Sequence, residues 1–394
     1  MKKRILLIHR GYPLGGNAGD KVRTLNMAIS LQNLGYQVIL LAFFTKGLSF
    51  LHTEKKNTPA GIKIIFAYSL PNRLGLAKIA AFLRSIYTRL ICDLYSIDLI
   101  QAELSSSATS VRFVKRLPLI TDFHSDIVPE LEMDSYPQRI VAHAASENKY
   151  ALKRSKGIIT VSENLKNNLR KYGPIPKKNY ILPCNFDPVP FQKVKLADRD
   201  NLRDELGLKN RIVLCYSGGL HTWQCIAETL DLVIRLRELN PAYFFCLFTN
   251  DDTTPYSSLL KKLEGAYMVK GLQKEEVPLF LSIIDVGFVL RANSLVNLNA
   301  SPTKGSEYLA SGAMIVTTRY AGDVPQQVED SQCGIVFDEL LVNEKELATV
   351  DEKIRAYYSR YSDCSQKAKD YVYSNRTWDS NEEKLAQLYN EINL

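Results

Sequence analysis

The segment 299–312 reads Asn-Ala-Ser-Pro-Thr-Lys-Gly-Ser-Glu-Tyr-Leu-Ala-Ser-Gly, and the rest of the chain is organised around it. It follows an apolar run at 286–290, which is typical of a buried strand, and it has the signals of a short helix. Ser301 is a favourable N-cap residue, and Pro302 suits the first helical position, where its missing N–H costs nothing. Gly312 suits the left-handed conformation that commonly ends a helix. The segment therefore predicts a strand, a turn and a capped helix.

The start of this helix has the features of an anion site. Free N–H groups and the positive end of the helix dipole are presented there, and Lys304 adds a full positive charge. Glu307 shares the same helical face and can accept hydrogen bonds from sugar hydroxyls. A phosphate clamp beside a hydroxyl acceptor indicates a nucleotide-sugar site. An ordinary capped helix with two solvated charges is the alternative.

Composition is that of a globular protein with more than one domain. The chain has 394 residues, of which 46% are hydrophobic and 23% charged. No apolar run approaches the roughly 20 residues that cross a bilayer, and the run at 5–8 is too short for a signal peptide. The seven cysteines include no C-x-x-C pair, and the five histidines no H-x-x-x-H pair. We therefore expect reduced thiols in a cytoplasmic protein, without a metal site or a cofactor.

Charge divides the chain into two unlike parts. Residues 1–190 contain 27 Lys and Arg against 13 Asp and Glu, a net charge of +14, whereas the other 204 residues contain 23 against 29, a net charge of −6. Opposite signs predict two domains, of which the basic one faces an anionic partner. No nucleic-acid-binding motif accompanies this charge. An anionic membrane surface or a lipid-phosphate acceptor fits as well or better.

The first half alternates apolar runs with helical patterns. The run at 5–8 is followed by a glycine-rich loop at 11–19, a helical pattern over 20–34 and an apolar run at 38–44. This order predicts a parallel sheet with a right-handed crossover. The loop lacks G-x-G-x-x-G, which disfavours a nicotinamide dinucleotide site. Further strands are expected at 63–68, 98–102, 119–122, 157–161 and 180–182.

The second half repeats this rhythm. The proline-bounded segment 183–188 and the polar stretch 198–204 are expected to form the interdomain linker. A run at 211–216 then leads into the glycine turn 217–220 and a helix over 223–239. Further strands are expected at 243–249, 268–269, 285–290, 313–317 and 334–337. Two such series predict a pair of Rossmann-like α/β domains, followed by an amphipathic helix over 378–392.

The helical pattern over 74–91 carries apolar and basic residues together. Its apolar residues lie on or near one face and are Leu76, Ile79, Ala80, Leu83, Ile86, Tyr87 and Leu90. Its basic residues are Lys78, Arg84 and Arg89, and Arg73 comes just before the pattern begins. We expect the apolar face to pack on the core and the basic side to be solvated. A helix that lies on a membrane surface is the alternative.

His124 lies in the segment Thr-Asp-Phe-His-Ser-Asp at 121–126, where the strand at 119–122 ends. Ligands of open α/β sheets bind at this end of the strands. The side chain can form hydrogen bonds and titrates near neutrality, so His124 is a candidate for contact with a reacting sugar. A histidine held inside a loop is the alternative.

Taken together, these segments resemble the GT-B glycosyltransferases, specifically retaining glycosyltransferase family 4 (group 1). The resemblance rests on the double Rossmann layout, the Gly15-Gly16 loop and S-P-T-K-x-x-E-Y-L-A-S-G at 301–312. Supporting segments are Arg23, D-F-H-S-D at 122–126, P-C-N-F-D at 183–187 and Y-S-G-G-L at 216–220. The resemblance covers essentially the whole chain. It implies an acceptor domain over 1–187 and a nucleotide-sugar domain over 188–377 that face across a cleft, with a helix over 378–394 packing back towards the first domain.

The family resemblance also implies site residues. Lys304 and the helix start hold the diphosphate together with Arg291, and Glu307 matches the second Glu of the family's E-x7-E motif, which binds ribose. His124 resembles a family histidine near the donor sugar. The implied catalytic residues are His124, Lys304 and Arg291. The implied donor-binding residues are Gly16, Gly218, Gly219, Gly271, Leu272, Asn299, Ser301, Pro302, Thr303, Lys304 and Glu307.

Three positions depart from the family's pattern. Asn299 stands where the first Glu of E-x7-E is expected, and an amide cannot act as a carboxylate base or nucleophile. Gly219 stands in place of a phosphate-binding arginine, and Gln224 in place of a lysine. Because of these departures, Arg291 and Lys304 are left to balance the negative charge of the diphosphate.

The predicted function is transfer of a hexose-type sugar from a nucleoside-diphosphate donor, with retention and without a metal. The acceptor is expected to be a saccharide or glycolipid in bacterial-type surface polysaccharide assembly. We expect a cytoplasmic protein, with peripheral contact at the inner face of a membrane left open. A GT-B-fold nucleotide-sugar epimerase and a catalytically degenerate nucleotide-sugar-binding subunit are the alternatives.

Overall fold

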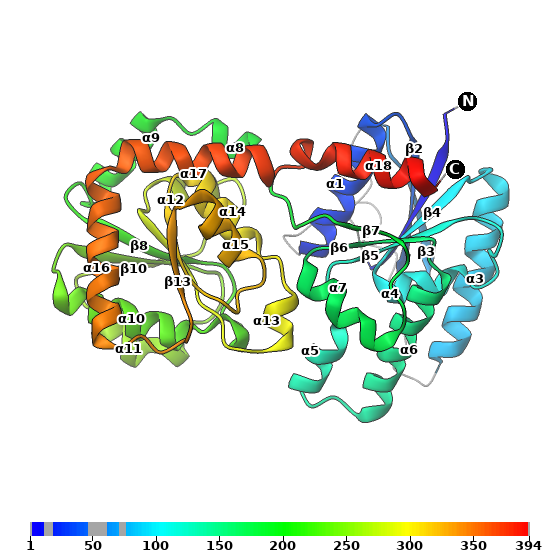
Figure 1. Cartoon of the computed structure of the whole chain (residues 1–394), viewed down its shortest axis with the longest axis horizontal. Helices are drawn as coiled ribbons and strands as arrows, with labels where there is room; N and C mark the ends of the chain where they lie inside the picture. The colour runs from blue at the N-terminus through cyan, green and yellow to red at the C-terminus, as the bar shows by residue number, and fades with distance from the viewer. Residues whose placement is uncertain (1, 12–18, 46–60, 71–75, 393–394) are drawn as a thin grey trace. The chain divides into compact units, whose positions relative to one another are not determined.

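The computed structural model describes residues 2–11, 19–45, 61–70 and 76–392. The chain divides into two compact units: Met1–Cys184 with Asn381–Leu394, and Asn185–Ser380 (Figure 1). Gly16, which was assigned to the donor site from the sequence, lies outside the described residues. No helix in the described ranges combines the length and the apolar character that a bilayer span requires.

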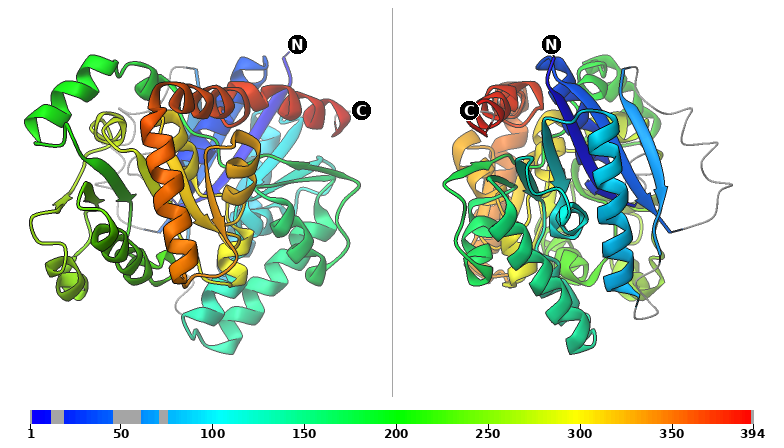
Figure 2. Two further views of the ribbon diagram at one scale, coloured as in Figure 1. Left: turned by 60° about the vertical axis from the view of Figure 1, so that its left-hand side comes forward. Right: turned by 90° about the vertical axis from the view of Figure 1, so that its right-hand side faces the viewer.

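The first unit is built on a parallel sheet with the strand order β3-β2-β1-β4-β5-β6-β7. Its strands are β1 Arg4–Arg10, β2 Gln37–Phe44, β3 Lys63–Tyr68, β4 Leu99–Glu103, β5 Leu119–Phe123, β6 Gly157–Thr160 and β7 Lys178–Ile181. Its helices are α1 Gly19–Asn33, α3 Ala77–Leu94, α4 Leu104–Ala108, η3 Thr109–Val111, α5 Ile127–Met133, α6 Gln138–Arg154, α7 Glu163–Leu169, η4 Arg170–Tyr172 and α18 Glu382–Ile392. Helices cover the sheet (Figure 2), so strands such as β1 are apolar and buried along most of their length.

The second unit has a parallel sheet with the order β10-β9-β8-β11-β12-β13. Its strands are β8 Ile212–Ser217, β9 Tyr243–Phe248, β10 Tyr267–Lys270, β11 Val286–Val289, β12 Met314–Thr318 and β13 Gly334–Phe337. Its helices are α8 Val189–Gln192, α9 Leu196–Glu205, η5 Thr222–Gln224, α10 Ile226–Leu239, η6 Thr254–Tyr256, α11 Ser257–Lys261, α12 Val277–Ser282, α13 Leu295–Asn299, α14 Thr303–Ser311, α15 Val324–Ser331, α16 Glu344–Ser359 and α17 Tyr361–Asn375, with η7 Asp379–Asn381 at its end. Every strand predicted from the sequence is present, and the prediction of two Rossmann-like parallel sheets is confirmed.

The last helix, α18, packs within the first unit. Leu385, Leu388 and Tyr389 form its buried side, as the amphipathic pattern predicted. The Tyr389 hydroxyl contacts Gln101 of β4, and the Tyr180 hydroxyl of β7 donates to Glu391 at 2.7 Å. These contacts tie the end of the chain to strands that lie far from it in the sequence.

The expectation that residues 198–204 belong to a linker is wrong, because they lie within α9. Arg203 of this helix is buried, and its Nη1 contacts Asp285 Oδ2 at 3.1 Å. Arg199 contacts Asp285 Oδ1 at 3.0 Å. Asp285 comes directly before β11, so charged residues that look solvated in the sequence instead anchor the helix to the sheet.

Candidate functional site

The carboxyl ends of β8 and β11, which are neighbours in the second sheet, carry the candidate donor site. β8 ends at Ser217 and continues into Gly218, whose φ of +126° favours glycine. A Cβ at this position would lie 2.7 Å from Cε of Lys304. Gly218 therefore gives the turn its backbone conformation and leaves room for the lysine side chain.

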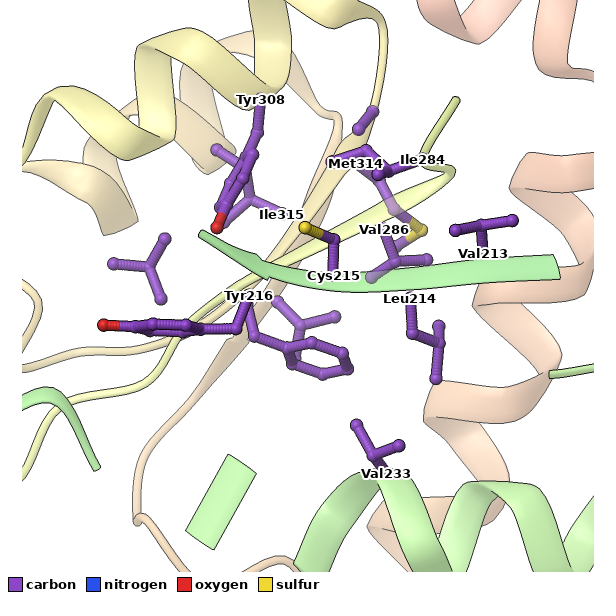
Figure 3. Close-up of a cluster of buried hydrophobic side chains, with 14 of the residues drawn as sticks. Val213, Leu214, Cys215, Tyr216, Val233, Ile284, Val286, Tyr308, Met314 and Ile315 are labelled. Carbon is purple, nitrogen blue, oxygen red and sulfur yellow. The ribbon is translucent and has the colours of Figure 1, made fainter. Parts of the chain in front are cut away.

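A tyrosine holds α14 against the end of β8. Tyr308 is fully buried, and its ring lies so close to Gly287 of β11 that a Cβ there would collide with it. Its hydroxyl accepts a hydrogen bond from the backbone N–H of Ser217 at 2.8 Å. Figure 3 shows Tyr308 and Tyr216 on opposite sides of β8. Because Lys304 lies about one turn before Tyr308 on α14, this contact fixes the helix that presents the lysine.

The start of α14 differs from the prediction. The helix begins at Thr303, and Pro302 occupies the N-cap position without a side-chain cap. The prediction of Ser301 as the N-cap is wrong, because its hydroxyl donates to Asp323 Oδ2 at 2.7 Å and accepts from Arg376 Nη2 at 3.2 Å. Charged partners from outside the helix thus engage this hydroxyl. Gly312 does end the helix in the left-handed conformation, with φ of +84°.

Lys304 is held by neutral groups. Its ammonium donates to the Tyr216 hydroxyl at 2.7 Å and to Gln224 Oε1 at 2.8 Å. The ammonium also lies 4.1 Å from the centroid of the Tyr216 ring, within range of a cation–π interaction. In the part of the chain that the structure describes, no carboxylate lies within ion-pair distance of this ammonium.

Arg291, two residues beyond the last residue of β11, is a second cation at the same site. It is only 4% exposed, and its Nη1 donates to the carbonyl oxygens of Leu290 at 2.9 Å and Gln224 at 3.4 Å. Its backbone N–H donates to Thr318 Oγ1 at 3.0 Å, which fixes the chain at the strand end. Within the described residues Arg291 forms no ion pair.

Burial and mutual repulsion shape the electrostatics of these cations. Burial lowers the pKa of Lys304 and of Arg291, and the charge of Arg291 lowers the pKa of Lys304 further. Burial raises the pKa of the Tyr216 phenol, so this hydroxyl stays neutral. Both cations contact only neutral groups, and the Glu307 carboxyl raises the pKa of Lys304 in part without forming an ion pair with it. The arrangement suits an anion that offers several oxygens, such as a phosphate or diphosphate group.

Glu307 is partly buried, one turn beyond Lys304 on α14. Burial raises the pKa of its carboxyl group, while the charges of Lys304 and Lys274 act in the opposite direction. Lys274 follows Gly271 and Leu272 in the turn after β10. Glu307 is therefore within electrostatic reach of Lys304 and of the turn that carries the predicted donor-binding residues Gly271 and Leu272.

The remaining predicted donor residues occupy different places. The carbonyl of Gly219 accepts a hydrogen bond from the Tyr216 hydroxyl at 2.6 Å, so Gly219 adjoins the Lys304 cluster. Leu272 is buried and its carbonyl accepts from Asn250 Nδ2 at 3.2 Å, at the end of β10 and two strands away from β8. Asn299 is buried at the end of α13, and Thr303 opens α14.

Two residues at this site were missed from the sequence. Gln224 was recognised only as a departure from the family's pattern, yet its side chain and carbonyl contact both cations. Tyr216 was noted only as part of a strand and a supporting segment. The available signal was its position directly before the Ser217-Gly218-Gly219 turn, at the end of a strand where ligands bind.

The first unit contains a buried cation of a different kind. Arg23 of α1 and Asp122 of β5 form a two-pronged ion pair, with Nε–Oδ2 at 2.7 Å and Nη2–Oδ1 at 3.0 Å. The guanidinium also donates to the carbonyl oxygens of Leu182 and Pro183, each at 3.0 Å. Arg23 is thus neutralised by the fold and ties α1 to β5 and to the segment after β7.

His124 lies at the end of β5, where the sequence predicted it, beside the missed residue Glu103 at the end of β4. His124 Nε2 is 3.9 Å from Glu103 Oε2, and neither atom has a hydrogen-bond partner among the described residues. Burial raises the pKa of Glu103 to about 8 and lowers the pKa of His124 to about 4. Near neutral pH the pair is therefore a protonated carboxyl group and a neutral imidazole. A carboxylate directly after an apolar strand was the signal for Glu103.

No group of three or more His, Cys, Asp or Glu is placed to hold a metal ion within the described ranges. Residues 19–188 match the sequence model of Glycosyltransferase Family 4. This match covers most of the first unit and confirms the resemblance to that family. No curated protein matches the chain.

Solved structures match over nearly the whole chain. HepE of Anabaena in complex with UDP has a TM-score of 0.74 at 15% identity, covering 99% of this chain and 100% of that chain. Sucrose-phosphate synthase of Thermosynechococcus elongatus has a TM-score of 0.76 at 15% identity, with 99% of each chain covered. WaaG, a glycosyltransferase involved in lipopolysaccharide biosynthesis, has a TM-score of 0.68 at 14% identity, covering 98% of this chain and 99% of that chain. The predicted GT-B fold is confirmed.

Proposed function

We propose that this GT-B chain, whose residues 19–188 match glycosyltransferase family 4, transfers a sugar from a nucleoside-diphosphate donor to an acceptor hydroxyl with retention. The observation that carries the proposal is a pair of cations, the buried Arg291 and the partly buried Lys304, which contact only neutral groups. Neither cation forms an ion pair within the described residues, and a diphosphate would supply an anionic partner to both. The complexes of HepE with UDP and with UDP-glucose support a nucleotide sugar as the donor class.

The chemistry that we propose depends on stabilising the leaving group. The bond between the anomeric carbon and the β-phosphate oxygen breaks, and the acceptor oxygen bonds to the same carbon on the same face. The acceptor proton passes to the departing phosphate oxygen, so no carboxylate nucleophile is required. Lys304 and Arg291 stabilise the negative charge that develops on the diphosphate, without a metal ion, and Tyr216 and Gln224 hold Lys304 in position.

His124 is proposed to contact the donor sugar as a neutral hydrogen-bonding group. Its pKa of about 4, which results mainly from burial, keeps the imidazole uncharged at neutral pH. A neutral ring does not repel the positive charge that develops on the sugar as the glycosidic bond to phosphate breaks. Asn299 and Glu307 are proposed to bind hydroxyl groups of the donor.

The proposed acceptor is a saccharide or glycolipid in bacterial-type surface polysaccharide assembly, on the cytoplasmic side of a membrane. The net charge of +14 over residues 1–190 supports an anionic partner for the first unit. The description of WaaG as a lipopolysaccharide glycosyltransferase supports the same setting.

A thermal-shift panel of UDP, GDP, ADP and CMP tests the donor class. We expect one nucleoside diphosphate to raise the melting temperature, because a ligand that binds only the folded state stabilises it. Absence of stabilisation by every nucleotide contradicts the proposal.

Incubation with the matching nucleotide sugar then separates the remaining activities. Release of nucleoside diphosphate that requires a saccharide or glycolipid acceptor supports transfer. Conversion of the donor alone to an epimer identifies a nucleotide-sugar epimerase instead. Nucleotide binding without release from any donor and acceptor mixture identifies a binding subunit.

A further inference from the structure

Helix α3 carries its large apolar residues on the outside. Its exposed apolar side chains are Ile79 (51%), Phe82 (52%), Leu83 (47%), Ile86 (39%), Leu90 (60%) and Leu94 (72%). Its buried residues are Ala80, Ala81, Arg84, Ser85, Thr88, Ile91 and Cys92, most of which are small or polar. The expectation that the apolar face packs on the core is therefore wrong for its large aliphatic residues, whereas Ala80 is buried and Tyr87 packs against the core.

The exposed residues form one continuous surface. Positions 79, 82, 83, 86, 90 and 94 repeat at helical spacing and so share one side of α3. Phe113 extends this surface, because it is 39% exposed and its ring packs edge-to-face on Phe82 at 5.3 Å between centroids. We call these seven residues the α3 face. In the right-hand view of Figure 2, α3 (cyan) is turned towards the viewer, and no other described helix is drawn in front of it.

An apolar surface of this extent needs a partner. Small residues let α3 lie close to the sheet, but they leave the Ile, Leu and Phe side chains in water. Each such side chain gains free energy when it leaves water, whether for protein or for lipid. A helix with an apolar face and basic neighbours is the arrangement found in helices that lie in the plane of a membrane interface.

Basic residues border the α3 face and indicate the charge of its partner. Lys78 and Arg89 are exposed on α3 itself, and Arg112, Lys115 and Arg116 are exposed around Phe113. Lys115 and Arg116 line the same groove as Ile86, Leu90 and Phe113. On this rim, Asp93 pairs with Arg89 at 3.4 Å. The other four basic residues form no ion pair within the described residues, so they can interact with an external anion.

We propose that the α3 face docks on an anionic bilayer surface, with its apolar side chains among the acyl chains and its basic rim against lipid phosphates. A second copy of this chain is a poorer occupant, because a two-fold contact would bring the basic rims together. The proposal rests on the proposed function in one respect, since a lipid-linked acceptor gives the surface its purpose. Binding to vesicles is measured without donor or acceptor, so the docking and the enzymatic activity can fail separately.

Co-sedimentation of the full chain with lipid vesicles tests the apolar part of the α3 face. We expect partition onto vesicles with about 30% phosphatidylglycerol and weak partition onto pure phosphatidylcholine. The triple variant Phe82→Ser/Leu90→Ser/Leu94→Ser should lower the partition coefficient at least about tenfold. A matched control is Leu196→Ser/Leu239→Ser/Leu341→Ser, which changes equally exposed leucines of the second unit and should partition as the wild type does.

The basic rim is tested in the same way. Lys115→Gln/Arg116→Gln should lower partition onto anionic vesicles by about fivefold for each residue, and added salt should reduce this difference. Lys345→Gln/Lys353→Gln, at exposed positions of the second unit, is its control. A Phe82→Trp variant gives a readout that requires no destabilising change: its fluorescence should shift to the blue with anionic vesicles and be quenched by brominated acyl chains.

Partition that is equal in the wild type and the triple variant overturns the proposal, as does unchanged fluorescence of the Phe82→Trp variant in the presence of anionic vesicles. A wild-type dimer that the triple variant dissociates, without vesicle binding by either, assigns the α3 face to a second copy and also overturns it. Vesicle binding that the triple variant loses and the control retains supports it, whatever the outcome of the transfer assay.

Discussion

Arg23 in the first unit and Arg291 in the second are buried, and Lys304 beside Arg291 is partly buried, but the partners of these cations differ. Arg23 has a carboxylate, Asp122, and further carbonyl acceptors within its own unit. Lys304 and Arg291 contact a phenol, an amide and backbone carbonyls. A cation that the fold neutralises serves the fold, whereas a pair of cations left with neutral partners is prepared for an anion from outside.

The largest effect is expected from breaking the neutralised pair. Arg23→Ala should lower the free energy of unfolding by about 3–5 kcal/mol, because Asp122 is left as an uncompensated buried charge. Urea unfolding measures this loss, with Lys153→Ala, at an exposed position of α6, as the control. The double variant Arg23→Met/Asp122→Asn should recover much of the stability. A loss below about 1 kcal/mol in Arg23→Ala would remove the structural role of the pair.

Loss of Lys304 should give the opposite pattern. Lys304→Ala is expected to lower turnover of the nucleotide sugar by about 10²–10³-fold, because charge on the leaving diphosphate is no longer stabilised. Its free energy of unfolding should stay the same or rise, since a partly buried cation whose direct contacts are all neutral is removed. Steady-state kinetics and urea unfolding of one preparation test both statements, with Lys262→Ala as the control. Activity close to that of the wild type would end the assignment of the phosphate site.

The smallest effect concerns Glu103, an acid that the first unit leaves without a counter-charge. Its pKa is raised to about 8, so the folded state keeps a proton that the unfolded state loses above about pH 4.5, and stability falls as the pH rises towards 8. The lowered pKa of His124 makes stability rise with pH below about pH 6.5. Between pH 6.5 and 8 the fall in stability caused by Glu103 is therefore not offset by His124. Glu103→Gln should flatten the decline in this window and be more stable than the wild type at pH 8 by about 1 kcal/mol or more.

Unfolding curves at several pH values measure the Glu103 effect. Glu132→Gln, at an exposed position, should keep the wild-type pH dependence. If the free energy of unfolding of Glu103→Gln falls between pH 6.5 and 8 as that of the wild type does, Glu103 is not the group that binds the extra proton.

The sequence predicted the sheets more completely than the site. Each strand of a buried parallel sheet is a local apolar run between turn residues, and every such run became a strand. Gly218 and Arg291 were predicted and follow the ends of two neighbouring strands, and the predicted Lys304 reaches this place from α14. Tyr216 and Gln224 were missed as site residues because neither residue type carries a charge that marks it in a sequence.

The sequence by itself determined the succession of strands and the segment that presents Lys304, because both depend on contacts between near neighbours along the chain. Only the tertiary structure decided which polar group meets which. Asp323 and Arg376 engage Ser301, Asp285 anchors α9, and Glu103 lies beside His124. Periodicity likewise identified the apolar face of α3 but not its surroundings, since a repeat of 3.6 residues defines one side of a helix without specifying what that side contacts.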